Sequence, residues 1–354
     1  MRSEILGLES ADYWQSLLDN FCKNQADIYF SPEYYQLANE NSEGEVRCFV
    51  FSQKGDVAIY PFMMNSINRL NIASLDDEYY DIQGAYGYNG VLSTSHDPQF
   101  KSAFYHHFEA YCKLNNIVAE FTRFHPVLGN HHFSRDNMEV LYNRRTLCVD
   151  LKPSYEDIWQ RSYNSNNRNM IRRAERAGLS FEESVKTDVE SFFDLYTTTM
   201  THVNAEKFYF FTKSYFNQLS ALNSHKQVNV YQNGVPVASL ILLIYGKYAH
   251  YHLAGRDIEN APPGAANLVL DQAVKVAKEN GCEYLHLGGG SSSFGEDGLF
   301  RFKSGFTKET SDFFIGKKVH NYNIYNKICE AWEKYNPQNT KKFNNLLLKY
   351  RKTA

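Results

Sequence analysis

Long apolar runs are absent from this sequence of 354 residues. No stretch reaches the roughly 18 apolar residues that a transmembrane helix needs, so no membrane-spanning helix is expected. The first ten residues carry acidic side chains where a signal peptide would need an apolar core. The sequence therefore predicts a soluble, cytoplasmic protein.

Motifs for disulfides, metals and hydrolysis are also missing. The six cysteines form no C-x-x-C pair and mostly lie beside apolar or aromatic residues, which predicts buried free thiols in a reducing compartment. The adjacent histidines His106-His107 and His131-His132 have no cysteine or aspartate at ligand spacing, so no metal is expected. No Gly-x-Ser-x-Gly elbow occurs, and a hydrolase is not indicated.

Charge of one sign is not in excess. The formal net charge is -3 and the isoelectric point is about 6.5, so no global field favours nucleic acid or an anionic membrane, and any anion site must be local. Aromatic residues make up 15% of the chain, which suits both an aromatic core and surfaces that hold sugars or bases. The length predicts two domains.

Two similar hairpins are predicted 180 residues apart, since Val50-Phe51 and Val57-Ala58 align with Val230-Tyr231 and Val237-Ala238. Asn233-Gly234 joins the second pair and is a strong turn signal. A helical stretch and a strand follow each hairpin, so the sequence predicts a duplicated α/β unit. The predicted elements are strands 46–50 and 57–63, helix 98–115 and strand 117–124, then strands 228–231 and 235–244, helix 264–280 and strand 282–287.

The domain boundary is predicted near residue 150, where Ser154 can cap a helix that begins the second half. A further helix, 165–177, ends at Gly178, which suits a left-handed cap. The predicted organisation is an N-terminal domain over 1–150, a C-terminal domain over 151–320 and a helical extension over 321–354. The lysines of that extension favour a helix packed on the body, with peripheral contact to an anionic membrane as the alternative.

The most informative segment is a predicted strand that ends at Gly288-Gly289-Gly290 and is followed by the run from Asp297 to Phe306. Glycines allow close backbone approach to a ligand and leave N–H groups free for an anion or carbonyl. The segment is not a P-loop, because no Gly-Lys-Ser/Thr follows at the required spacing. Lys303, between Phe302 and Phe306, could neutralise a phosphate or a developing oxyanion, or could be a surface lysine flanked by core phenylalanines.

The run Gly298-Leu299-Phe300-Arg301-Phe302-Lys303-Ser304-Gly305-Phe306 is similar to the C-terminal signature of the FemABX aminoacyltransferases and resembles a wider GNAT-like group. The resemblance implies an α/β (α+β) fold of two tandem GNAT-like domains, each a mixed, mostly antiparallel sheet flanked by helices. It also implies that Lys303 supplies electrostatic stabilisation, that Phe302 packs on the acyl donor, and that Gly288 and Gly289 lie beside the substrate.

Three other segments resemble the same group. The stretch 167–178 is similar to the helix that opens the second domain, which implies that Arg168 and Arg172 hold acceptor phosphates. The stretch 248–256 resembles a cleft-lining strand that ends in a glycine bulge, at Gly255. The loop 81–90 resembles a Tyr-Gly-Tyr-Gly-Gly loop, which implies that Tyr86 and Tyr88 face a carbohydrate or nucleotide.

The resemblance implies an acyl or aminoacyl transferase that acts on an amine of a nucleotide- or lipid-linked cell-envelope glycan precursor. The acyl group would come from a co-substrate, aminoacyl-tRNA or acyl-CoA, with no bound cofactor. Aminoacyl-tRNA is favoured because Ala261 stands where acetyl-CoA-dependent GNAT enzymes carry Arg or Gln, although Gly264 and Ala266 of that loop are kept. Asp297 and His252 are the candidate general bases. The alternatives are an acyl-CoA-dependent N-acyltransferase of polysaccharide biosynthesis and a non-catalytic binding module.

Overall fold

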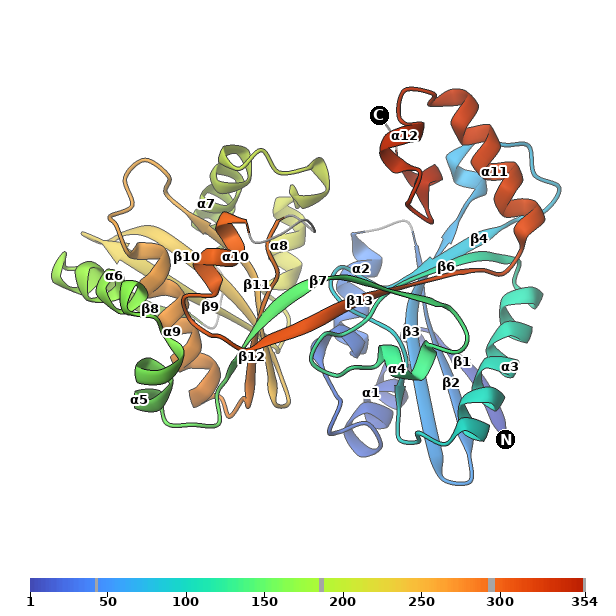
Figure 1. Ribbon diagram of the computed structural model, residues 1–354, viewed down its shortest axis with the longest axis horizontal. Coiled ribbons are helices and arrows are strands. Elements are labelled where there is room, and N and C mark those ends of the chain that lie inside the picture. The colour runs from blue at the N-terminus through green and yellow to red at the C-terminus, as the bar shows by residue number, and fades with distance from the viewer. Residues whose placement is uncertain (42–43, 185–187, 292–296, 353–354) are drawn as a thin grey trace. The chain divides into compact units, whose positions relative to one another are not determined.

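The computed structural model describes residues 1–41, 44–184, 188–291 and 297–352. The chain forms two compact units, one of residues 1–143 with 313–354 and the other of residues 144–312 (Figure 1). The boundaries predicted at 150 and 320 fall a few residues later than these divisions. The C-terminal helices, predicted as a separate extension, group with the first unit.

The first unit is built on a mixed sheet in the order β1-β2-β3-β4-β6-β13. Neighbouring strands are antiparallel except β4 and β6, which are parallel, and the short β5 pairs with β3. The strands are β1 (Arg2–Leu6), β2 (Glu45–Gln53), β3 (Asp56–Ser66), β4 (Tyr80–Gln83), β5 (Leu92–Ser93), β6 (Ile117–Arg123) and β13 (Thr310–Val319). The α-helices are α1 (Ala11–Asn20), α2 (Pro32–Glu40), α3 (Pro98–Leu114), α4 (His131–Ser134), α11 (Tyr322–Tyr335) and α12 (Thr340–Phe343).

Helix α3 carries much of the first unit's core. The Asp97 side chain accepts from the Gln99 N–H at 3.1 Å and Pro98 opens the helix, which is a favoured start. Phe100, Phe104 and Phe108 follow at a spacing of four, so they share one face and are buried against the phenylalanines of β2. Each buried aromatic ring of this kind contributes about 1.5–3 kcal/mol of hydrophobic stabilisation.

The second unit repeats this plan with a sheet in the order β7-β12-β11-β10-β9-β8, in which only β11 and β12 are parallel. Asn233 and Gly234 both have positive φ, 51° and 78°, as the predicted tight hairpin requires. The strands are β7 (Glu139–Asp150), β8 (Ser180–Ser184), β9 (His225–Gln232), β10 (Val235–Tyr245), β11 (Tyr248–Arg256) and β12 (Tyr284–Gly288). The α-helices are α5 (Tyr155–Asp157), α6 (Ser165–Arg176), α7 (Val189–His202), α8 (Lys213–Leu219), α9 (Ala265–Glu279) and α10 (Gly298–Lys303).

The duplication is visible in the topology. In each unit a hairpin leads to a third antiparallel strand, then a helix, then a strand parallel to the third: β2-β3-β4-α3-β6 and β9-β10-β11-α9-β12. One strand of each sheet crosses a division of the chain: β7 begins before residue 144, and β13 begins before residue 313. The predicted fold class, α/β with two tandem units of mixed sheet and flanking helices, is confirmed.

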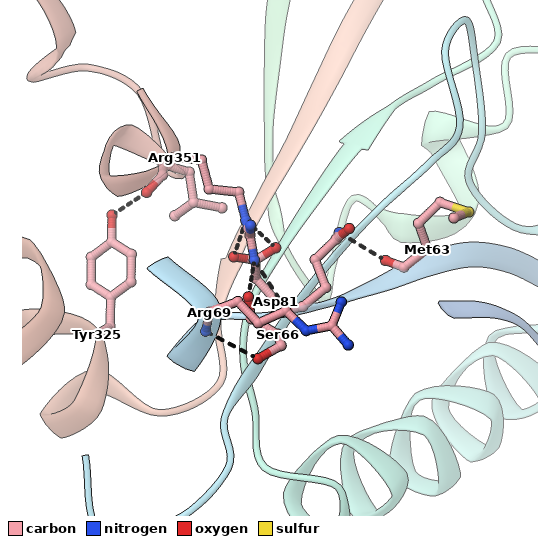
Figure 2. Close-up of polar contacts among 8 residues, drawn as sticks. Met63, Ser66, Arg69, Asp81, Tyr325 and Arg351 are labelled. Atoms are coloured by element: carbon pink, nitrogen blue, oxygen red, sulfur yellow. Dashed lines mark hydrogen bonds and ion pairs between the residues drawn. The ribbon is translucent and has the colours of Figure 1, made fainter. Parts of the chain in front are cut away.

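The C-terminal segment is anchored within the first unit by an ion pair between Arg351, which is partly buried, and the buried Asp81. The Arg351 Nε lies 2.9 and 2.7 Å from the two carboxylate oxygens of Asp81, and its Nη2 donates to the carbonyls of Asn65 and Ser66 at 3.1 Å each (Figure 2). Asp81 is fully buried; burial raises the pKa of its carboxyl, and the Arg351 guanidinium opposes that rise. Trp332 and Tyr350 pack in the small core beside this pair.

The lysine-rich end of this segment is also held by its own unit. Phe343 and Leu348 pack against the same small core, and Lys349 donates to the Glu333 carboxylate at 2.6 Å. Among the helices that the structure describes, none is long and apolar enough to cross a membrane.

Candidate functional site

The second unit has an opening in its sheet where two parallel strands diverge. β11 and β12 are paired only from Tyr248 to His250, opposite residues 284–286, and beyond this ladder their main chains no longer bond to each other. The pairing of β11 with β10 shifts at His252, which marks a bulge. β12 ends at Gly288, whose φ of +74° lies in the left-handed region. Main-chain polar groups that lose a strand partner in this way are available to a ligand.

Lys303 lies at this divergence. It ends the short helix α10, and only 5% of its surface is exposed. The Nζ lies 3.2 Å from the carbonyl oxygen of Gly289 and 4.7 Å from the centre of the Tyr251 ring. Gly289 directly follows β12 and Tyr251 lies in β11, so the ammonium contacts both diverging strands. Among the described residues the Gly289 carbonyl is its hydrogen-bond acceptor, although an ammonium can donate three bonds.

Burial lowers the pKa of Lys303 to about 8, and the opposing influence of the Asp297 carboxylate is smaller. The group is therefore mainly charged at pH 7. Burial raises the pKa of Tyr251, so its hydroxyl stays protonated and the Lys303 ammonium lies over a neutral aromatic ring. A buried cation with few partners can stabilise negative charge that develops on a ligand, because water does not screen it.

The glycines before α10 allow close packing around this lysine. A Cβ on Gly288 would lie 3.6 Å from the Lys303 Nζ, and one on Gly289 would press on the Arg144 side chain at 3.1 Å. The Arg144 Nη1 donates to the carbonyl of Gly290 at 3.1 Å. The strand end is thus held by side chains on both sides. Gly288 and Gly289 lie close to Lys303, and their place beside a substrate stays a prediction.

Asp297 is engaged in local structure. Its Oδ1 accepts from the Phe300 N–H at 2.9 Å, which caps α10, and its Oδ2 accepts from the Ser291 hydroxyl at 2.6 Å. One carboxylate oxygen therefore caps the helix that ends at Lys303, and the other holds the Ser291 side chain. The geometry makes Asp297 a positioning residue for the lysine, beside its predicted part as a base.

His252 is buried and bonded to Tyr215, with 3.0 Å between the imidazole Nε2 and the hydroxyl oxygen. Burial, helped by the neighbouring His250 and His225, lowers the pKa of His252 to about 3. The imidazole is neutral at pH 7, because burial makes its protonated form unfavourable. A general base works best with a pKa near the operating pH, and His252 is far from that range.

Helix α6 supports the turn that follows Lys303. Phe306 packs edge to face on Tyr163 with ring centres 5.0 Å apart, and on Phe302 at 5.7 Å. The carbonyl of Gly305 accepts from the Asn164 N–H at 2.9 Å, and a Cβ on Gly305 would lie only 2.3 Å from the Asn167 side chain. The glycine in the signature is therefore required by close packing against α6.

Asn167 is a structural residue that the sequence reasoning missed. It is buried, and its Oδ1 accepts from the Asn267 side chain at 3.0 Å, which joins α6 to the first turn of α9. The signal was available: residue 167 shares the buried face of the helix with Ile171 and Ala174 at helical spacing. A polar residue on such a face indicates a specific partner.

Arg168 and Arg172 lie on the same helix with different surroundings. The Arg168 Nη1 donates to the carbonyls of Trp159 at 3.2 Å and of Tyr163, at the end of the π-helical turn Ile158–Ser162. Arg172 is exposed and its guanidinium lies 5.6 Å from the centre of the Trp159 ring. Arg168 thus stabilises the entry to α6, and Arg172 is the more accessible cation.

Gly255 serves the packing of α7 on β11. A Cβ there would lie 2.4 Å from the Tyr196 nitrogen and 2.5 Å from the Leu195 carbonyl carbon, so only glycine allows the helix backbone this close. The predicted bulge in β11 is found instead at His252, three residues earlier.

The tyrosine loop belongs to the first unit and is held by one arginine. The Arg123 side chain donates to the carbonyls of Gly87 at 2.9 Å and of Ala85 at 2.8 Å. Gly87 has a φ of +114° and its Cα faces the Tyr29 ring. Tyr86 and Tyr88 are half-buried, and Tyr88 packs edge to face on Tyr29 with ring centres 5.4 Å apart. The loop is therefore an ordered aromatic surface.

All six cysteines are buried free thiols, as predicted. Burial raises the pKa of Cys22 and of Cys148 to about 12 in each case, so these thiols are protonated at neutral pH and are poor nucleophiles.

The fold and the family comparison agree on the class of protein. Residues 161–304 match the family described as acetyltransferase (GNAT) domain. This span holds the diverging strands β11 and β12, helix α9 and Lys303. The second unit therefore contains a GNAT-type acyltransferase domain, and the predicted enzyme class, an acyltransferase, is confirmed at that level. Domains of this class transfer an acyl group from an acyl-CoA co-substrate to an amine acceptor.

Solved structures extend the likeness to the whole chain. FemX aligns over 92% of this chain and 99% of its own, with a TM-score of 0.69 at 12% identity. L-PGS from Bacillus licheniformis aligns over 90% and 95%, with a TM-score of 0.55 at 11% identity. A tandem GNAT protein from the clavulanic acid biosynthesis pathway aligns over 89% and 98%, with a TM-score of 0.50 at 10% identity. The chain thus has the FemX-like tandem GNAT fold. No curated protein gave a significant match.

Proposed function

We propose that this chain is an N-acyltransferase of FemABX type, which transfers an acyl or aminoacyl group to an amine of a nucleotide- or lipid-linked cell-envelope glycan precursor. The observation that carries the proposal is Lys303, a buried ammonium placed where β11 and β12 diverge within the GNAT domain. The wider likeness to FemX supports the choice of acceptor class.

In the proposed reaction the neutral acceptor amine attacks the carbonyl carbon of the donor ester or thioester. A C–N bond forms and the carbonyl π electrons move to oxygen, giving a tetrahedral oxyanion. Collapse re-forms the carbonyl and expels the alkoxide or thiolate leaving group, which takes up the proton that the amine loses. Lys303 stabilises the oxyanion with its charge and its remaining N–H groups, and the main-chain N–H groups at the divergence orient the carbonyl.

The donor that we favour is aminoacyl-tRNA. In acetyl-CoA-dependent relatives the loop before a helix wraps the pyrophosphate, and here that loop precedes α9. Gly264, the N-cap of α9, has a φ of +99°, and a Cβ on it would lie 2.2 Å from the carbonyl oxygen of Met170 in α6. Asn267 in the first turn is bonded to Asn167. Helix α6 therefore packs directly on the first turn of α9, and Ala261 adds no cation.

The second candidate is an acyl-CoA-dependent N-acyltransferase of polysaccharide biosynthesis. The observation that favours it is the family match over residues 161–304, since acetyltransferase domains of this family take their acyl group from acyl-CoA. It predicts that coenzyme A raises the melting temperature, because a ligand that binds only the native state stabilises it.

In the second unit, we propose that Arg172 supplies a phosphate contact to the acceptor. Taken by itself, the first unit offers an aromatic face at Tyr86 and Tyr88 that suits a sugar or base. The tyrosine loop is ordered by Arg123, and Arg172 is exposed beside Trp159. Phe302, which packs partly buried against the second core and Phe306, would support the acyl group.

The test is to incubate the purified protein with nucleotide-linked amino sugars and either acetyl-CoA or a mixed charged-tRNA pool, and to search for mass-shifted products. Product from the tRNA pool alone supports the proposal. Product from acetyl-CoA alone overturns the proposed donor and supports the second candidate. Calorimetric binding of the sugars without product from either donor indicates a non-catalytic binding module.

A further inference from the structure

A cavity lies wholly within the first unit and has no part in the proposed chemistry. Its volume is about 610 Å³, and it opens between the C-terminal end of α3, the start of β6, the end of β13 and the first turn of α11. Figure 1 shows α3 and α11 meeting at the start of β6. Its lining includes Lys113, Lys318, His320, Tyr322 and Asn323.

His320 links this cavity to a buried carboxylate. The His320 side chain is 7% exposed and the Glu120 side chain is 1% exposed, with 3.0 Å between the imidazole Nε2 and the carboxylate Oε2. The Tyr60 hydroxyl donates to the other oxygen, Oε1, at 2.8 Å. A carboxylate accepts hydrogen bonds and does not donate them, so the Nε2 of His320 carries a proton.

The second imidazole nitrogen of His320 is left for a ligand. Its Nδ1 has no hydrogen-bond partner among the described residues, and the side chain lines the cavity. A nearly buried imidazole whose Nε2 is held and whose Nδ1 has no described partner can form a hydrogen bond with a ligand in the cavity.

The first turn of α11 adds two backbone donors. Asn321 caps this helix, with its Oδ1 accepting from the Ile324 N–H at 3.2 Å, and its own N–H donates to the Val118 carbonyl. The N–H groups of Tyr322 and Asn323 have no acceptor among the described residues, and both residues line the cavity. Free N–H groups in the first turn of a helix favour an anion, as does the helix dipole.

The charges around the cavity also favour an anion. Lys113 is exposed at the rim, and Lys318 forms an ion pair with Glu109, which is the exposed acid of the lining. Lys113 is therefore the positive charge in excess. Cys112 also borders the cavity, but burial raises the pKa of its thiol well above the usual range, so it adds no negative charge.

We propose that this cavity binds a small phosphate-bearing molecule, with the phosphate held between the first turn of α11, His320 and Lys113. The volume admits a phosphate together with a sugar or a nucleoside, within the range of small-molecule sites. The site is separate in sequence from the GNAT domain, since its residues come from 109–117 and 318–323, outside 161–304.

The experiment is isothermal titration calorimetry of the full chain with inorganic phosphate, glucose 6-phosphate and uridine monophosphate as separate probes. One-to-one, saturable binding of at least one probe is expected, and the strongest probe identifies the group attached to the phosphate. His320→Gln keeps a donor for Glu120 but removes Nδ1, and it should weaken binding by about tenfold or more. Lys113→Ala should weaken it too. Lys327→Ala, an exposed lysine on the same helix outside the lining, is the matched control and should leave binding unchanged.

Amide NMR of the wild-type chain tests the site without a variant that might misfold. The Tyr322 and Asn323 amide signals should shift on titration with the bound probe. Absence of saturable binding for all three probes overturns the proposal. So does equal weakening by Lys327→Ala, or binding that shifts neither amide. The Lys303→Met variant should bind the probes normally, so this result is independent of the proposed transferase activity.

Discussion

Two cations, one in each unit, differ in how their charge is used: Arg351 is partly buried against a fully buried carboxylate, and Lys303 is itself buried. Arg351 in the first unit meets both oxygens of Asp81 and two carbonyls. Within the part of the chain that the structure describes, Lys303 in the second unit meets one carbonyl and the face of Tyr251. The planar guanidinium matches its acceptors and fixes the chain, whereas the ammonium retains N–H groups that a ligand can use.

The two pKa shifts express the same difference. At Asp81, burial raises the pKa of the carboxyl but Arg351 opposes it directly through contact. At Lys303, burial lowers the pKa to about 8, and the opposing influence of the Asp297 carboxylate is smaller. An ion pair whose groups find hydrogen-bond partners in each other and in nearby carbonyls therefore indicates a structural role. A buried charge with few described partners indicates a functional role.

The largest expected effect breaks the satisfied pair. Arg351→Met leaves the Asp81 carboxylate buried without its cation, and the free energy of unfolding of the first unit should fall by about 3–5 kcal/mol. Urea unfolding followed by tryptophan fluorescence measures this, since Trp332 lies in the adjoining core. Arg135→Met, which removes an exposed arginine of the same unit, is the control. A loss below about 1 kcal/mol would show that the pair does not anchor the segment.

The second prediction concerns the under-satisfied charge. Lys303→Met should lower kcat/KM for acyl transfer by about 100-fold or more, as does removal of an oxyanion donor elsewhere. Its melting temperature should stay equal or rise, because a pKa lowered from 10.5 to about 8 corresponds to a cost of about 3 kcal/mol for holding the charge. The exposed Lys308→Met is the matched control. A loss of activity under about tenfold, a barrier change of about 1.4 kcal/mol, argues against the proposed role.

A third prediction concerns His252, a buried side chain that is neutral, unlike the two cations. The pKa of His252 is about 3 in the native state and 6.5 as its ordinary value, so below pH 6.5 the unfolded chain binds a proton that the native chain does not. Stability should therefore fall as pH decreases from 6.5 towards 3, by about 2 kcal/mol at pH 5 from this group.

His252→Gln can still form a hydrogen bond with Tyr215, but the fall in its free energy of unfolding between pH 7 and 5 should be smaller by about 2 kcal/mol, as measured by urea unfolding. His106→Gln, which changes an exposed histidine, is the control and should show the same fall as the wild-type chain. An unchanged slope in His252→Gln would mean that the imidazole is not held neutral by burial.

The smallest expected effect is a pH limb of activity. If the charged form of Lys303 is needed, kcat/KM should fall about tenfold per pH unit above pH 8, where the native lysine loses its proton. Stability changes in the opposite direction: between pH 8 and 10.5 the unfolded chain holds a proton that the native chain has released, so folding becomes more favourable. Lys303→Arg keeps its charge, and the descending limb near pH 8 should be absent from its profile. If that limb persists, another group causes it.

Local signals in the sequence were enough for most of the elements. Alternating apolar residues and Asn233-Gly234 identified the hairpin of β9 and β10, and the caps at Asp97 and Ser154 are found at the expected helix starts. The predicted left-handed residue at Gly178 has a φ of +76°. These features depend on neighbours in the chain, which is why a single sequence shows them.

The site was harder, because its contacts are between distant segments. The signature around Lys303 was visible, but Tyr251 as its ring partner depends on where β11 and β12 stop pairing. The role of Gly255 depends on α7, and that of Asn167 on α9, some 100 residues away. Nothing local specified β13, whose partner β6 lies nearly 200 residues earlier. Long-range pairing of this kind leaves no periodic signal.

The crossing strands have a consequence for the order of folding during synthesis. The second unit, residues 144–312, is one continuous stretch and can complete its sheet as soon as it has left the ribosome. The first unit begins earlier, but its sheet needs β13 and its ion pair needs Arg351, and both follow the second unit in the sequence. The sheet of the first unit is thus completed only after all of the second unit's strands have been translated, which reverses the usual N-terminal-first order and leaves β6 paired with β4 alone until β13 emerges.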